Sequence, residues 1–331
     1  MVEIAAAPQH HEHHLTLTER ALNYTAWGTA VALFVTVGWM AMAPDDPFGA
    51  VSLMTRGGAG LMVLQIAGLA GVVSAVATLL VGRRLADAGV FAAAVGLAVA
   101  NLRGETSSYI LINLGQADVS KYRSIYATFV VEGFVWFLVI LVAMVVGGLV
   151  MRWCLPAPAR SDESSVTLPL LAISEIPFLA RFVGAALISR AAVLQGLKNT
   201  VTTSIVALLV LQLISAGDPS RAIRHGQTYF SIALAFYAGA LLAHEFAAVP
   251  TAWWSLLATP CVCAIGYFWS LFNIDRNQLA SVPPTPFARA TPIEYVAVGS
   301  AAVVAAFWLI RRSAASKAAA AAQQTPARKK S

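Results

Sequence analysis

The residue best placed for chemistry is Glu132, an acidic side chain inside a long apolar run. An ionisable group in membrane hydrocarbon costs about 2.5–3.5 kcal/mol on insertion scales, so such residues are rare and often functional. Glu132 could handle a proton or an ion, and Gly133 beside it would allow another helix to approach. The alternative is a structural carboxyl that pairs with an arginine such as Arg103 or Arg181, or that burial keeps neutral.

A second candidate pair, His244 and Glu245, lies near the end of another apolar run. The next residues are Phe, Ala and Ala, so the run lacks the second histidine of a His-Glu-x-x-His zinc site. A helix would separate His244 from His225 by about 28 Å, too far for one haem to bind both. We predict no cofactor, and a structural role at the interface is the simpler interpretation of the pair.

Asp45 and Asp46 follow the first apolar run, between two prolines. Their position is similar to the acidic motif in the first external loop of polytopic glycosyltransferases that use lipid-linked sugars. That resemblance implies a membrane enzyme whose carboxylates act on a metal or as a base. An Asp pair between prolines is also an ordinary turn.

The N-terminal tail carries a cluster of histidines that could bind a metal. On a helix, His10, His13 and His14 would share one face, and imidazoles suit zinc, nickel or copper. A solvated polar tail is the alternative interpretation.

The chain that positions these groups is apolar enough to lie in a membrane. Hydrophobic residues make up 58% of it and charged residues only 11%, whereas a soluble domain carries about 25% charged residues. A spanning helix needs about 20 mostly apolar residues. Eight runs qualify: residues 22–43, 59–81, 85–102, 125–151, 201–215, 228–248, 252–272 and 293–310. We therefore predict an all-α, polytopic transmembrane helical bundle of about eight spans.

The segment from Pro169 to Asn199 is harder to interpret, because it is apolar but carries several charges. We predict that residues 177–197 form an extra helix that lies at the interface or is buried against other helices. The alternative is a ninth span, which would place the two termini on opposite sides. The fifth span, residues 201–215, is short unless it begins before Lys198.

The basic residues predict the orientation of the chain. With eight spans, the segments on the N-terminal side hold more Lys and Arg than the opposite loops, which indicates that both termini are cytoplasmic. Residues 21–312 would form one membrane domain between a polar His-rich tail (1–20) and an Ala-rich basic tail (313–331). The basic tail suits anionic lipid, so the expected partner is the bilayer and not a nucleic acid.

Three functions remain open. Small residues recur at every fourth position, as in Ala67-Gly71-Ala75, Ala92-Gly96-Ala100 and Ala235-Gly239-Ala243, which is typical of close helix packing within or between chains. The leading hypothesis is a non-catalytic scaffold or accessory subunit of a membrane assembly, with other subunits or a second copy as partners. The alternatives are a small-solute or proton-coupled transporter or channel that uses Glu132, and the glycosyltransferase-like enzyme that uses Asp45 and Asp46.

Overall fold

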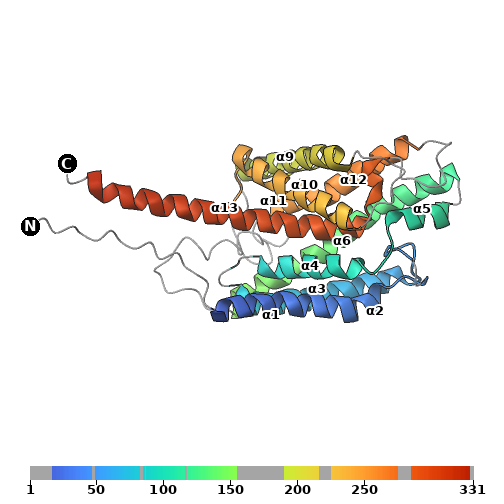
Figure 1. The fold of residues 1–331 in the computed structure, drawn as a ribbon, viewed down its shortest axis with the longest axis horizontal. Helices are drawn as coiled ribbons and strands as arrows, with labels where there is room; N and C mark the ends of the chain where they lie inside the picture. Colours follow the sequence, from blue (N-terminus) through green and yellow to red (C-terminus); the bar gives the residue numbers. More distant parts are fainter. Residues whose placement is uncertain are drawn as a thin grey trace, which may run out of the picture.

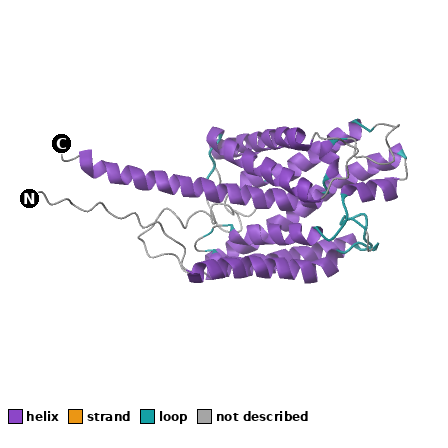
Figure 2. Ribbon diagram, viewed as in Figure 1, coloured by secondary structure: helices purple, strands orange, loops and turns teal. Residues whose placement is uncertain are grey.

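The chain folds into a bundle of packed helices, seen in a computed structural model (Figure 1). The structure describes residues 17–46, 49–82, 85, 87–115, 118–154, 190–215, 225–274 and 285–328. Within these ranges the regular elements are helices, without a strand (Figure 2). In chain order they are α1 (Leu17–Leu33), the π-helical η1 (Phe34–Gly38), α2 (Trp39–Met42), α3 (Ala59–Val81), α4 (Ala88–Asn101), α5 (Ser107–Gly115), α6 (Val119–Cys154), α9 (Arg190–Ser215), α10 (His225–Phe246), α11 (Trp253–Leu256), α12 (Ala258–Phe272), the 3-10 helix η2 (Pro286–Arg289) and α13 (Pro292–Arg328).

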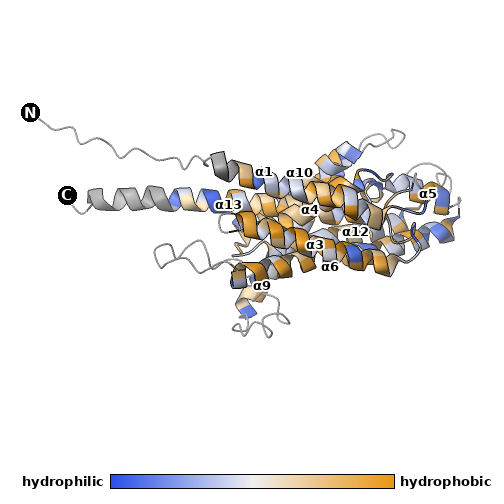
Figure 3. Cartoon of the chain, turned by 90° about the horizontal axis from the view of Figure 1, so that it is seen from below, coloured by the Kyte–Doolittle hydropathy of each residue, from blue (hydrophilic) through white to orange (hydrophobic). Residues whose placement is uncertain are grey.

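Seven helical segments of the described chain are long and apolar enough to cross a membrane, which confirms a multi-pass integral membrane protein. They are Ala21–Met42, Ala59–Val81, Val119–Cys154, Arg190–Ile214, His225–Phe246, Trp253–Phe272 and Pro292–Lys317. Hydrophobic residues extend along the bundle, whereas hydrophilic ones occur at α5 and on the short coloured stretch of α13 just past the bundle (Figure 3). α9, for example, exposes an apolar stripe that suits lipid: Leu194, Leu197, Val201, Ile205, Leu209 and Leu213.

The predicted third span, residues 85–102, is shorter than a membrane crossing. Its helix, α4, has 14 residues and rises about 21 Å, less than the roughly 30 Å of hydrocarbon. α4 lies inside the bundle against α1, α3, α6 and α13, and most of its residues are buried. The described chain thus has seven helices of membrane length where about eight spans were predicted, and α4 is a shorter apolar helix. An apolar run does not reveal whether lipid or protein will cover it.

The fifth predicted span is longer than expected. α9 begins at Arg190, so the last part of the proposed interfacial helix (177–197) belongs to a membrane-length helix. Residues 177–189 of that prediction, and Arg181 with them, lie outside the described residues.

The bundle has two distinct ends. α1 begins and α13 ends on the same side of the bundle (Figure 1). We call this side the tail end, and Asp87 pairs with Arg311 there. We call the other the loop end, where α5 and η2 meet through the bond from Ser107 Oγ to the Ala288 carbonyl. The described chain therefore starts and finishes at one end. Which end is cytoplasmic stays a prediction from the basic residues.

The repeated small residues pack helices of the same chain together. A Cβ on Gly96 would overlap the Phe34 ring, and one on Gly239 would lie 2.9 Å from the Thr203 carbonyl oxygen. Gly71 packs less tightly, because a Cβ added to it would lie 3.4 Å from a Val146 methyl group, an ordinary contact distance. The predicted close packing is confirmed, and each of these glycines meets another helix of its own chain.

Candidate functional site at the loop end

Glu132 is held by three hydrogen-bond donors of its own chain. The Ser52 hydroxyl donates to Oε2 at 2.7 Å, and the Trp136 indole N–H donates to Oε1 at 2.9 Å. The backbone N–H of Leu53 is a third donor. Glu132 is 0% exposed, so these bonds replace the water that a carboxylate would otherwise need.

The local structure explains why these donors meet Glu132. Trp136 lies one turn further along α6, on the same helix face. Ser52 is brought in by a tight turn between α2 and α3, in which Thr55 donates its backbone N–H to the Ser52 carbonyl. The Ser52 hydroxyl also accepts the Met54 N–H at 3.2 Å. The carboxylate therefore fastens the α2–α3 turn to the centre of the bundle.

Arg103, one of the predicted ion-pair partners of Glu132, contacts other residues. Its guanidinium donates to the Val35 carbonyl at 2.8 Å and lies 4.7 Å above the Trp39 ring. The alternative partner, Arg181, is outside the described residues. An ion pair between Glu132 and Arg103 is thus absent, and neutral donors satisfy the carboxylate.

Gly133 has the role that its position suggested, because it allows α12 to approach α6. A Cβ on Gly133 would lie 2.7 Å from Cys263 Sγ. Aromatic rings pack around the same contact, with the centroids of Phe129 and Tyr267 5.0 Å apart. This packing gives Glu132 a densely filled apolar surrounding.

A second buried carboxylate at the loop end, Glu294, was missed from the sequence. Its Oε1 lies 2.7 Å from His225 Nδ1, and its Oε2 accepts the Thr291 backbone N–H at 2.7 Å. His225 Nε2 lies 2.9 Å from the Gly104 carbonyl oxygen. The signal that could have revealed Glu294 is its spacing from Thr291, which is that of a capping box at the start of α13.

Asp45 forms a hydrogen bond within the loop between α2 and α3, whereas Asp46 ties that loop to α5. Asp45 accepts the Gly57 backbone N–H at 2.7 Å, and Asp46 accepts the Tyr109 hydroxyl. The second bond raises the pKa of Tyr109, because the phenol proton is held by a carboxylate. Across the described ranges, no three His, Cys, Asp or Glu side chains are grouped so as to hold a metal ion. The two carboxylates thus hold the α2–α3 loop, Asp45 from within and Asp46 against α5.

His244 and Glu245 lie at the other end of α10 from His225, so the structure does not bring them to Glu132. The His244 ring meets the Phe307 ring edge-on at 5.9 Å, and its Nδ1 has no hydrogen-bond partner among the described residues. Glu245 is exposed. The remaining metal candidates, His10, His13 and His14, lie outside the described residues.

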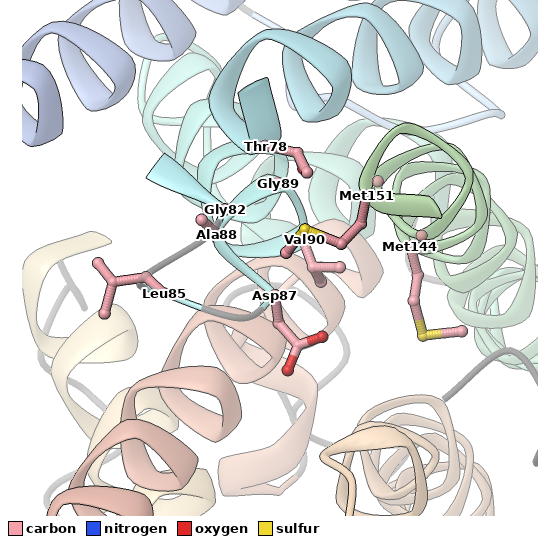
Figure 4. A pocket seen from close by; sticks show the side chains of 11 residues that line it. Thr78, Gly82, Leu85, Asp87, Ala88, Gly89, Val90, Met144 and Met151 are labelled. Carbon is pink, nitrogen blue, oxygen red and sulfur yellow. The ribbon is translucent and has the colours of Figure 1, made fainter. Parts of the chain in front are cut away.

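A small cavity opens at the tail end, where α3, α4 and α6 meet (Figure 4). Its volume of about 20 Å³ holds roughly one water molecule. Asp87 borders it in a left-handed conformation, with φ of 62°, and Arg311 reaches its carboxylate at 3.4 Å. Burial raises the pKa of Asp87, and Arg311 opposes that rise in part. Glu132 is not among the lining residues, so the predicted ion-handling group and this cavity are separate.

Comparison with known proteins adds no relative, because no protein-family model, curated protein or solved structure matches this chain.

Proposed function

We propose that this protein is a non-catalytic integral membrane scaffold or an accessory subunit of a membrane assembly. The bonding of Glu132 carries the proposal, because Ser52, Leu53 and Trp136 donate to the carboxylate that sequence reasoning had singled out. A carrier of protons or ions needs a carboxylate that reaches water during its cycle. Glu132 is instead used to hold a turn in place.

The outer faces of α1 and α3 support a role in binding other membrane helices. A Cβ on Gly28 or Gly68 would meet no atom within 4 Å, so another backbone can approach these positions closely. Gln65, on the same side of α3 as Gly68, is exposed and makes no hydrogen bond with the described residues. A side-chain amide in a membrane is satisfied best by a polar group of a neighbouring helix.

Site-specific photocrosslinking in native membranes tests the proposal. A photoreactive residue is placed at position 28 or 68, and at position 205 on the apolar stripe of α9 as the matched control. We expect discrete protein adducts from positions 28 and 68 and only lipid adducts from position 205. Lipid adducts alone at all three positions would contradict a scaffold role.

Flux measurement separates the scaffold from the transporter that uses Glu132. Purified wild-type protein and the Glu132→Gln variant are reconstituted in liposomes with a pH-sensitive dye inside. We expect both to match empty liposomes. A proton flux in the wild type that disappears in a folded Glu132→Gln variant would overturn the proposal in favour of transport.

A further inference from the structure

His225 connects three separate parts of the chain at the loop end. The residue begins α10, its Nδ1 faces Glu294 of α13 at 2.7 Å, and its Nε2 faces the carbonyl of Gly104 in the α4–α5 connection at 2.9 Å. The side chain of His225 is 18% exposed and that of Glu294 only 1%. The imidazole is thus a bridge between a buried carboxylate and a backbone carbonyl.

The geometry of this bridge requires a proton beyond those of a neutral histidine and an ionised glutamate. A carbonyl oxygen only accepts hydrogen bonds, so Nε2 must carry a hydrogen toward Gly104. The contact between Nδ1 and Glu294 then needs a second hydrogen, on the ring or on the carboxyl group. Without that proton, a nitrogen lone pair faces either the carboxylate or the carbonyl oxygen, and one of the two contacts is lost.

Two further titratable groups lie near the ring, one on the α4–α5 connection and one on α10. Glu105, in the α4–α5 connection, adds a second negative charge that acts on His225. Tyr229, one turn along α10, meets the ring edge-on at 6.1 Å. The Tyr229 hydroxyl donates to the Ala98 carbonyl at 2.8 Å, so its proton is engaged with α4.

The loop held by His225 also contacts a second loop. The residue after Gly104, Glu105, donates its backbone N–H to the Gly49 carbonyl at 3.2 Å. Gly49 lies between α2 and α3, in the connection that Glu132 anchors through Ser52. The α4–α5 connection is therefore bonded to His225 at Gly104 and to the α2–α3 connection at Glu105.

We propose that His225 and Glu294 form a proton-dependent clamp that holds the α4–α5 connection against α10 and α13 and releases it when the shared proton is lost. The clamp is independent of the scaffold function proposed above, since it concerns the loop end of the bundle whatever partner the protein binds. In the predicted orientation, it responds to the pH of the compartment opposite the cytoplasm.

Hydrogen exchange of the protein in lipid nanodiscs, followed from pH 6 to pH 10, tests the clamp. After correction for the intrinsic pH dependence of exchange, amides of residues 103–107 should exchange about tenfold faster above a one-proton midpoint, because one hydrogen bond to a charged group is lost. His225→Gln should abolish the step. His244→Gln, on the same helix at the other end, should retain it.

Two further measurements keep the test decisive if His225→Gln does not fold. Glu294→Gln removes the negative charge but keeps an acceptor, and it should move the midpoint down by at least one pH unit. In the wild type, the ¹⁵N resonances of the His225 ring should titrate with the same midpoint as the exchange step. A step that persists in His225→Gln, or a ring that titrates at a different pH from the loop, would overturn the proposal.

Discussion

Replacement of Glu132 separates the contribution of its hydrogen bonds from that of its volume. Glu132→Ala leaves the donors of Ser52, Leu53 and Trp136 buried without their acceptor. An orphaned buried donor costs about 1–3 kcal/mol, and the three neutral donors together with the cavity left by the shortened side chain give about 3–5 kcal/mol. We expect Glu132→Ala to lower the free energy of unfolding by about 3–5 kcal/mol.

Glu132→Gln keeps the volume but turns one acceptor into an amide NH₂ group. One oxygen still accepts a bond, while the NH₂ group meets a second donor, so the expected loss is about 1–3 kcal/mol. Glu245→Ala, an exposed glutamate on α10, is the matched control and should change stability by less than about 0.5 kcal/mol. The predicted order of stability is therefore Glu245→Ala, then Glu132→Gln, then Glu132→Ala.

Unfolding of the purified variants by SDS in mixed micelles, followed by far-UV circular dichroism, measures these differences. The far-UV spectra of the folded variants should match one another, and only their free energies of unfolding should differ. A Glu132→Ala variant as stable as the control would refute the reasoning, because it would show that the three donors find other acceptors at no cost.

Further predictions concern packing, capping and one polar bridge. Gly89→Ala places a methyl group against Ser74 and should cost about 1–3 kcal/mol in the same SDS assay, whereas Gly68→Ala, which meets no atom within 4 Å, should be neutral or stabilising. Asp118 accepts the Ser120 N–H and hydroxyl at the start of α6, which lowers its pKa. Its contribution is thus complete above the unfolded pKa of about 3.9 and is lost as the pH falls through the folded pKa. Asp118→Asn should keep the cap but remove this acid sensitivity in melting curves between pH 3 and 6; an unchanged pH profile would contradict the assignment. Asn199 donates to the Ala247 carbonyl and accepts from Ser255, so Asn199→Ala should cost about 1–3 kcal/mol, and a thermal midpoint equal to that of the wild type would argue against the bridge.

The sequence by itself determined the fold class and the presence of an acidic residue, Glu132, inside an apolar run. Long apolar runs are unfavourable in water and favourable in lipid. A helix is the simplest structure that pairs all its backbone N–H and C=O groups there. An acidic residue in such a run, as at Glu132, is conspicuous because its neighbours are apolar. The small-residue repeats around Gly71, Gly96 and Gly239 predicted close packing for the same local reason.

Only the tertiary structure decided what each of these groups contacts. The α4 run is as apolar as a lipid-facing span, yet the bundle buries it, because lipid and protein interior select the same residue types. Glu132 meets Ser52 from 80 positions away, and His225 meets Gly104 from 121 positions away. Hydrogen bonds of this kind depend on the relative placement of whole helices, which local spacing does not specify.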